Sequence, residues 1–276
     1  MSDKDVFLPL ITPFNAAGQV CRGSVARLMC FARPNVDGFV PCLTSGEGWL
    51  LSDAQWHDMV QLCVQFADGL PVIAGIERAT TEAVIERAHV AQQLGAQGVI
   101  CTAPFQPGLS QNAIYEHFAR VHEATPLDLY IYFESTLCNN RWEISTLLSL
   151  CELPRVKAIK ESSGENKVAP HLRNIRRMGV KVYQGWEDKI LEYDADGSMV
   201  SYCNLNPRLC QEVTRQRSYA ASALMNEQCR SKGVFLPDWY RHLKLDLHAR
   251  GIIDSARTLE PAKDIRHDQP EATLPA

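Results

Sequence analysis

The sequence predicts an α/β protein with the (β/α)8 TIM barrel fold and additional C-terminal helices. Eight short apolar segments follow one another along the 276 residues, and each is followed by a stretch with helical features. This alternation indicates βαβ units and a parallel sheet. Eight units favour a closed barrel, which commonly takes about 250 residues as one domain. An open dinucleotide-binding sheet is disfavoured, because no Gly-x-Gly-x-x-Gly follows the first apolar segment.

Each predicted strand is a short, mostly apolar run that ends at a turn or at a polar residue. The eight predicted strands are residues 6–11, 38–43, 71–75, 98–103, 127–133, 156–160, 180–184 and 198–202. Apolar spacing, and capping residues such as Ser52 and Ser110, mark the helices between them. The predicted helices are residues 22–33, 53–67, 80 or 81 to 94, 111–124, 142–151, 166–178 and 186–193, with another that starts at Pro207.

The chain after residue 218 has helical patterns but no strand pattern. Residues 220–230 and 239–250 are predicted helices, and two prolines, Pro270 and Pro275, lie close to the C-terminus. We therefore expect a barrel over residues 1–218 and a helical extension over 219–266 that packs on it. Residues 267–276 are expected to form a flexible tail.

Charge and hydropathy argue against several classes of partner. The net charge of -4 gives no basic surface for nucleic acid. No apolar run approaches the roughly 20 residues needed to span a bilayer. The first residues, Met1 to Asp5, run into a strand without the long apolar region of a signal peptide. We therefore expect a cytoplasmic protein that binds neither nucleic acid nor membrane.

The ten cysteines are scattered through the sequence, and no Cys-x-x-Cys pair occurs. This distribution favours buried thiols in a reducing compartment over a disulfide framework or a zinc site. The cysteines in apolar segments are Cys30, Cys63, Cys101, Cys151 and Cys210. No cluster of His, Cys and carboxylate side chains has the spacing of metal ligands, so we expect neither a metal nor another cofactor.

Lys160 lies at the C-terminal end of a predicted strand, where parallel barrels place their chemistry. In a mostly apolar barrel mouth, a lysine can be desolvated and lose its proton. The neutral amine can then attack a ketone and form a Schiff base. Considered alone, Lys160 is more simply a solvated lysine, since most lysines are exposed.

Polar groups at the other strand ends suit the same chemistry. Tyr132 offers a phenol on the neighbouring strand, although it could also be one of two alternating strand aromatics with Tyr130. The turn over residues 44–48 offers hydroxyl and backbone N–H groups that can hold a carboxylate. The candidate site residues are Thr44, Ser45, Tyr132, Glu134, Lys160, Ser162, Gly185, Trp186, Glu187 and Ser201.

Three motifs make the chain resemble the dihydrodipicolinate synthase and N-acetylneuraminate lyase family of class I aldolases. Residues 44–47, Thr-Ser-Gly-Glu, resemble the loop that holds the carboxylate of a 2-oxo acid. Residues 131–132, Ile-Tyr, match the start of the family's Tyr-Asn-x-Pro motif, and residues 159–164, Ile-Lys-Glu-Ser-Ser-Gly, match the Schiff-base lysine motif. Their order and their common place at strand ends argue against chance agreement.

The resemblance implies a role for each matched residue. Lys160 would attack the keto carbon of pyruvate or a related 2-oxo acid, while Ser45 and Thr44 would bind its carboxylate. Tyr132 would transfer protons to and from the carbinolamine and an aldehyde partner. The imine acts as an electron sink, so the adjacent carbon can be deprotonated or its C–C bond cleaved. The resemblance also implies a homodimer or a homotetramer.

Several positions depart from the family pattern. Leu43 replaces the first glycine of the carboxylate loop, where a positive φ would be strained, and Phe133 stands where asparagine is usual. Gln106 and Leu137 stand where the lysine-pathway synthases carry an interface tyrosine and an arginine for the second substrate. Condensation with aspartate semialdehyde is therefore not expected.

Residues 184–188, Gln-Gly-Trp-Glu-Asp, resemble the segment with which sialate lyases contact substrate hydroxyls. Gly185, Trp186 and Glu187 are therefore candidates for binding a polar partner, although acidic residues at a helix start can simply complement its N-terminus. Glu134, which is unusual for the family, is a candidate specificity residue.

Three functions fit these observations. The first is an active lyase or aldolase on a 2-oxo acid. The second is a dehydratase or hydratase-aldolase that acts on a sugar acid or an aryl pyruvate. The third is a non-catalytic binder of 2-oxo acids, which the altered positions Leu43 and Phe133 would suit.

Overall fold

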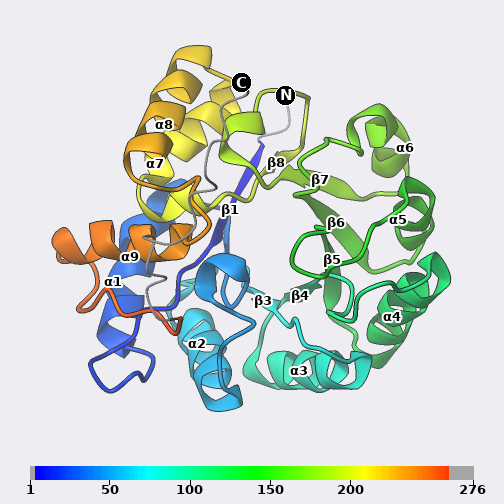
Figure 1. Cartoon of the computed structure of the whole chain (residues 1–276), viewed down its shortest axis with the longest axis horizontal. Helices are drawn as coiled ribbons and strands as arrows, with labels where there is room; N and C mark the ends of the chain where they lie inside the picture. Colours follow the sequence, from blue (N-terminus) through cyan, green and yellow to red (C-terminus); the bar gives the residue numbers. More distant parts are fainter. Residues whose placement is uncertain (1–3, 261–276) are drawn as a thin grey trace, which may run out of the picture.

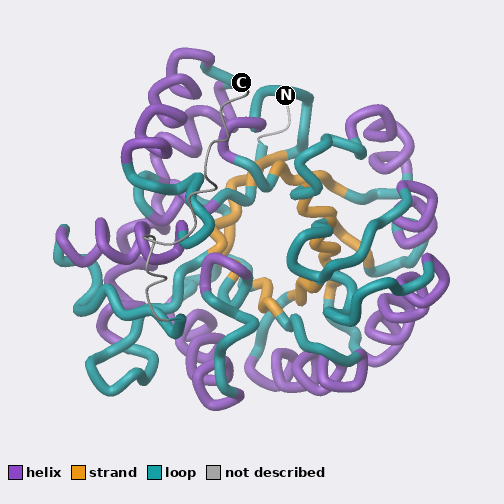
Figure 2. Tube along the Cα trace, viewed as in Figure 1, coloured by secondary structure: helices purple, strands orange, loops and turns teal. Residues whose placement is uncertain are grey.

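In the computed structural model, which describes residues 4–260, eight parallel strands form a sheet that curves into a barrel inside a ring of helices (Figures 1 and 2). The predicted fold is therefore confirmed. The strand order is β2-β1-β8-β7-β6-β5-β4-β3, and a parallel bridge between Phe39 and Val72 joins the two ends. The strands are β1 Asp5–Pro9, β2 Gly38–Val40, β3 Ile73–Gly75, β4 Gly98–Cys101, β5 Asp128–Phe133, β6 Val156–Glu161, β7 Lys181–Gln184 and β8 Gly197–Ser198.

Most helices begin where the sequence places a capping side chain. Ser52 and Gln55 form a reciprocal capping box, and the side chains of Thr80 and Ser110 accept backbone N–H bonds at the next two helix starts. The helices are α1 Arg22–Ala32, α2 Asp53–Phe66, α3 Thr81–Leu94, α4 Gln111–Ala124, α5 Ile144–Leu150, α6 Leu172–Arg177, α7 Pro207–Gln211, α8 Tyr219–Ser231 and α9 Trp239–Ala249.

The second half of the barrel differs from the prediction in detail. The strand expected over residues 198–202 ends at Ser198, because Ser201–Asn204 forms a 3-10 turn. The helix expected over residues 186–193 is reduced to the 3-10 turn Glu187–Lys189. The helix expected over residues 166–178 is split into the turn Ala169–His171 and the short α6.

The barrel interior is filled by side chains from β1 to β7 and by Met199, which directly follows β8. Because side chains alternate along a strand, positions two apart share the inner face. The interior cluster contains Phe7, Val40, Leu43, Ile73, Ile100, Tyr132, Ala158, Tyr183 and Met199, with Tyr130 packed against it. The polar residues at the C-terminal ends of the strands lie directly above this apolar layer.

Of the helices after the barrel, α8 contacts α7, and the end of α9 lies at α1, where the guanidinium of Arg250 lies over the ring of Phe31 (Figure 1). Helix α8 contacts the turn Glu187–Lys189, and α9 contacts the turns Thr44–Gly46 and Ser201–Asn204. The C-terminal helices therefore support three turns at the strand ends. The last part of the predicted extension, residues 261–266, and the predicted tail, residues 267–276, lie outside the described residues.

All ten cysteines lie in the described part of the chain, and none forms a disulfide there. Cys63, Cys101, Cys151 and Cys210 are buried as predicted, but Cys30 is exposed. The buried face of α1 consists of Ser24, Val25, Leu28, Met29 and Ala32, and Cys30 lies outside it. Within residues 4–260, no helix has the length and apolar character needed to cross a membrane.

Candidate active site

Lys160 is the next-to-last residue of β6, and its side chain points into the barrel. The residue is only 4% exposed, and its Nζ lies 4.1 Å from the ring centroid of Tyr132. Burial lowers the pKa of Lys160 to about 8, although the carboxyl groups of Glu77, Glu187 and Glu134 act in the opposite direction. The alternative of a solvated lysine does not fit this position.

Tyr132 is the direct neighbour of Lys160 across the β5–β6 pairing. Its phenolic oxygen lies 3.3 Å from Oγ1 of Thr44, at the start of the loop after β2. Burial raises the pKa of Tyr132 well above its ordinary value, so the phenol stays protonated near neutral pH. The structure thus brings together the amine, the phenol and the hydroxyl that the sequence predicts as one site.

Residues 44–46 of the carboxylate loop form a 3-10 turn, and a serine from another turn faces it. Oγ of Ser45 lies 2.7 Å from Oγ of Ser201. The strain considered for Leu43 is absent, because its φ is -87°. The left-handed φ values occur instead at Cys42 and Glu47, at 62° and 56°. The first N–H groups of a helical turn have no partner within the turn, so this loop can offer donors to a carboxylate.

Gly185, directly after β7, leaves room for two side chains of the site. A Cβ at this position would lie 2.0 Å from Oγ of Ser162 and 3.1 Å from Cε of Lys160. Oγ of Ser162 is buried next to the phenol of Tyr132 and makes no hydrogen bond of standard geometry to any described residue. Gly185 therefore acts through the space it leaves, and the hydroxyl of Ser162 is available to a ligand.

Glu134 and Glu187, two of the residues predicted to bind substrate, form hydrogen bonds with backbone N–H groups of the protein itself. The carboxylate of Glu134 accepts the N–H groups of Thr136 and Leu137, the latter at 2.8 Å. The carboxylate of Glu187 accepts the N–H of Tyr202 at 3.0 Å, and burial raises the pKa of Glu187. Both carboxylates hold the loops that frame the site, and their contact with a substrate stays a prediction.

The remaining positions that the sequence singles out lie around the site. Trp186 is 40% exposed, at the rim beside Gly185. Phe133 is buried and packs against Trp142 with 5.5 Å between ring centroids, so it points away from the barrel interior. Gln106 is exposed in the loop after β4, and Leu137 is half-buried in the loop after β5.

Glu77 is a residue of the site that the sequence analysis did not identify. It follows β3 by two residues, is 2% exposed, and neither carboxyl oxygen has a hydrogen-bond partner among the described residues. Burial raises the pKa of Glu77 to about 8, with the charge of Lys160 acting in the opposite direction. Extending the alternation of β3 from Ile73 would have placed Glu77 on the inner face.

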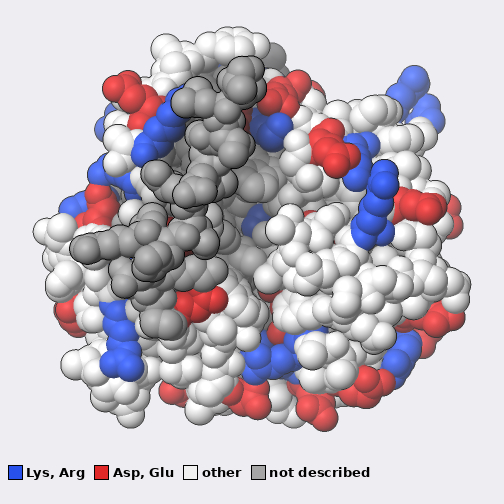
Figure 3. Space-filling view, viewed as in Figure 1, with Lys and Arg blue, Asp and Glu red and all other residues white. Residues whose placement is uncertain are grey.

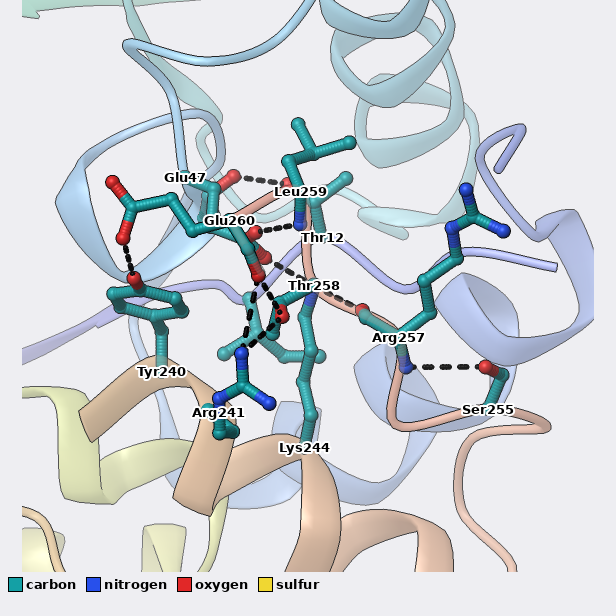
Figure 4. Close-up of polar contacts among 12 residues, drawn as sticks. Thr12, Glu47, Tyr240, Arg241, Lys244, Ser255, Arg257, Thr258, Leu259 and Glu260 are labelled. Carbon is teal, nitrogen blue, oxygen red and sulfur yellow. Dashed lines mark hydrogen bonds and ion pairs between the residues drawn. The ribbon is translucent and has the colours of Figure 1, made fainter. Parts of the chain in front are cut away.

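A buried ion pair ties the carboxylate loop to the C-terminal helices, and it too was not predicted (Figure 4). Nζ of Lys244 on α9 contacts the carboxylate of Glu47, and both side chains are 0% exposed. Lys244 also donates to the carbonyl oxygen of Arg257 at 2.9 Å. The other carboxylate oxygen of Glu47 accepts the N–H of Leu259 at 2.6 Å. Residues 257–259 and α9 thus hold the loop in place.

The space-filling view shows a hollow near the centre of the face in view, with Lys, Arg, Asp and Glu side chains interspersed around it (Figure 3).

In the part of the chain that the structure describes, no group of three or more His, Cys, Asp and Glu side chains could hold a metal ion.

A model of the dihydrodipicolinate synthetase family matches residues 3–273 of this chain. The 4-hydroxy-tetrahydrodipicolinate synthase of Bartonella bacilliformis is 26% identical over 284 aligned positions, which cover 98% of this chain and 97% of the relative. The enzyme of the same name from Anaplasma marginale is 30% identical over 217 positions, which cover 76% and 71%.

A solved structure with the same fold is that of a dihydrodipicolinate synthase from Acinetobacter baumannii complexed with pyruvate. Its TM-score against this chain is 0.84, and the match covers 95% of this chain and 94% of that one. The sequence identity is 22%, so this similarity supports the fold alone.

Proposed function

Because the chain belongs to the dihydrodipicolinate synthetase family of class I aldolases, we propose that it is a lyase that forms a Schiff base with pyruvate or a related 2-oxo acid. Lys160 provides the amine. The proposal covers the making or breaking of a bond between the carbon next to the imine carbon and the carbon of an aldehyde, because the imine accepts the electron pair of that bond.

The observation that carries this proposal is the buried amine of Lys160. An amine with a pKa of about 8 is uncharged in about one molecule in ten at pH 7. An amine with the ordinary pKa of 10.5 is uncharged in about one molecule in 3,000. Since only the uncharged form attacks a carbonyl, burial raises the reactive fraction by about two orders of magnitude.

The neighbouring groups fit the other steps. Ser45 and Thr44 would hold the carboxylate of the 2-oxo acid, together with the N–H groups of their turn. The phenol of Tyr132 would give a proton to the carbinolamine oxygen, which leaves as water. The hydroxyl of Thr44 lies within hydrogen-bond reach of that phenol and would orient it.

The second reactant is proposed to differ from aspartate semialdehyde. Gln106 and Leu137 offer neither the phenol nor the guanidinium that the lysine-pathway synthases use, and three carboxyl groups lie around Lys160. Without that guanidinium, the carboxylate of aspartate semialdehyde would find no cationic partner at these two positions. A homodimer or homotetramer stays a prediction.

The proposal is tested by trapping the imine. The protein is incubated with pyruvate and borohydride, its intact mass is measured, and the modified peptide is sequenced. We expect one reduced adduct, located at Lys160. An unchanged mass with pyruvate and with several other 2-oxo acids would contradict the proposed function. If the protein converts a 2-oxo acid and an aldehyde, and Lys160→Ala abolishes this turnover, the alternative of a non-catalytic 2-oxo-acid binder is excluded.

Replacing Tyr132 by phenylalanine is expected to slow imine formation by roughly 10²-fold, because proton transfer by a positioned side chain contributes about 10² to 10⁴. The rate is measured by mixing with pyruvate and quenching into borohydride. Tyr130→Phe is the matched control, since Tyr130 lies one inward position deeper on β5. Equal rates in the two variants would show that the phenol of Tyr132 does not transfer the proton.

A further inference from the structure

Glu77 places an unpaired carboxyl group inside the barrel mouth. The residue is 2% exposed, and neither of its carboxyl oxygens accepts or donates a hydrogen bond within residues 4–260. The nearby guanidinium of Arg87 binds the carbonyl oxygen of Glu77 at 3.3 Å and not its carboxyl group. A buried polar group without a partner lowers the stability of the fold, and a charged one does so more strongly. A bound ligand would supply that partner.

The strand register places Glu77 in the same layer as the reactive groups. One inward layer of the barrel consists of the paired residues Gly75, Ile100, Tyr130 and Ala158. The next inward positions, two residues further along, are Glu77, Thr102, Tyr132 and Lys160. The hydrogen bond from the N–H of Ile76 to the carbonyl of Ile100, at 3.0 Å, continues the β3–β4 ladder up to this layer. Glu77 therefore faces the pocket that contains Lys160.

Of the three carboxyl groups around Lys160, that of Glu77 has the strongest effect on the amine. The other two, Glu134 and Glu187, are engaged in backbone hydrogen bonds that hold their loops. Tyr132 stays protonated and cannot accept a proton while it holds its own. Glu77 is thus the carboxyl group of this set that is free to exchange a proton with a substrate.

We propose that Glu77 is the base that removes a proton from C3 of the 2-oxo acid after Lys160 has formed the imine, an inference that rests on the proposed function. The carboxylate of Glu77 takes the proton, and the C–H electron pair becomes the C2–C3 double bond. The C–N π pair moves to the nitrogen of Lys160. A protonated imine and a carboxylate thus become a neutral enamine and a carboxylic acid, and no further reactant is needed.

The raised pKa of Glu77 suits the removal of a proton from C3. Burial raises the pKa of Glu77 to about 8, while Lys160 and Arg87 lower it and Glu134 raises it. A base is most effective when its pKa lies near the working pH. An ordinary glutamate, with a pKa near 4.5, would be a much weaker base toward a C–H bond.

The test follows the exchange of the C3 protons of pyruvate for deuterium in D2O by NMR, which needs no second substrate. In Glu77→Gln, we expect borohydride trapping still to give the adduct at Lys160, while C3 exchange falls roughly 10²-fold. This isosteric variant should fold, because the carboxyl group makes no hydrogen bond that could be lost. Glu86→Gln, on the exposed side of α3, is the control and should exchange at the wild-type rate.

A second variant guards against a purely structural effect. In Glu77→Ala, added formate should raise the exchange rate several-fold by replacing the missing carboxyl group, whereas Glu86→Ala should not respond. Normal trapping with wild-type exchange in Glu77→Gln, or no response of Glu77→Ala to formate, would overturn the role of Glu77. Absence of any adduct in the wild type would instead overturn the proposed function.

Discussion

Replacing Lys160 by alanine is expected to abolish the borohydride-trapped adduct and to lower the rate of C3 exchange by about 10⁴-fold or more, as for other removed nucleophiles. Alanine offers no amine, so no covalent intermediate can form. Lys160→Arg should be equally inactive, because a guanidinium stays charged and does not attack a carbonyl. The rates are measured with pyruvate by NMR and by intact mass.

The control for this variant is on the same strand. Lys157 is also on β6, but its side chain is 49% exposed and lies 3.9 Å from Asp128, so it points away from the barrel interior. Lys157→Ala should keep the adduct and the exchange rate. Retention of either signal in Lys160→Ala would show that another amine carries the reaction.

Replacing Lys244 by methionine is expected to lower the free energy of unfolding by about 3–5 kcal/mol, because it leaves the buried carboxylate of Glu47 without a counter-ion. The loop over residues 44–47 should also lose its fixed position, which would raise the KM for the 2-oxo acid. Urea unfolding gives the stability, and the pyruvate dependence of trapping gives the affinity.

A double variant distinguishes the effect of the unpaired charge on Glu47 from the effect of the changed packing at position 244. Lys244→Met combined with Glu47→Gln removes the unpaired charge, so it should recover a large part of the stability lost in the single variant. As an exposed comparison, Lys181 pairs with Asp5 and is 55% exposed, so Lys181→Met should cost about 0–1 kcal/mol. If Lys181→Met and Lys244→Met lower the free energy of unfolding equally, the buried ion pair stabilises the protein no more than an exposed pair does.

The regular features of the fold could be predicted because they depend on local sequence. Ser52 and Ser110 mark their helix starts, and both cap those helices in the structure. The predicted strand over residues 198–202 was wrong beyond Ser198, because the carboxylate of Glu187 binds the N–H of Tyr202 and stabilises a turn there. Because this contact joins two separate segments of the chain, the local sequence of neither segment indicates it.

The positions of Lys160, Tyr132 and Ser45 at the strand ends could be predicted from residue type and strand order, and their roles stay predictions. Glu77 was not identified because the predicted strand ended at Gly75, although the alternation continues for two more residues. The importance of Lys244 could not be predicted from its own helix, because its burial depends on Glu47, 197 positions earlier. Both omissions concern charges whose surroundings are set by tertiary packing.

The lowered pKa of Lys160 predicts a definite pH dependence. The charged amine is disfavoured by burial, so the uncharged, reactive fraction rises as pH increases through the pKa of about 8 and levels off above it. Protein and pyruvate are mixed at a series of pH values and quenched into borohydride at one fixed pH, so that only imine formation sees the variation. We expect the initial rate of adduct formation at Lys160 to reach half its maximum near pH 8. A rate that still rises tenfold per pH unit up to about pH 10 would show an ordinary, solvated lysine and would contradict the buried-amine mechanism.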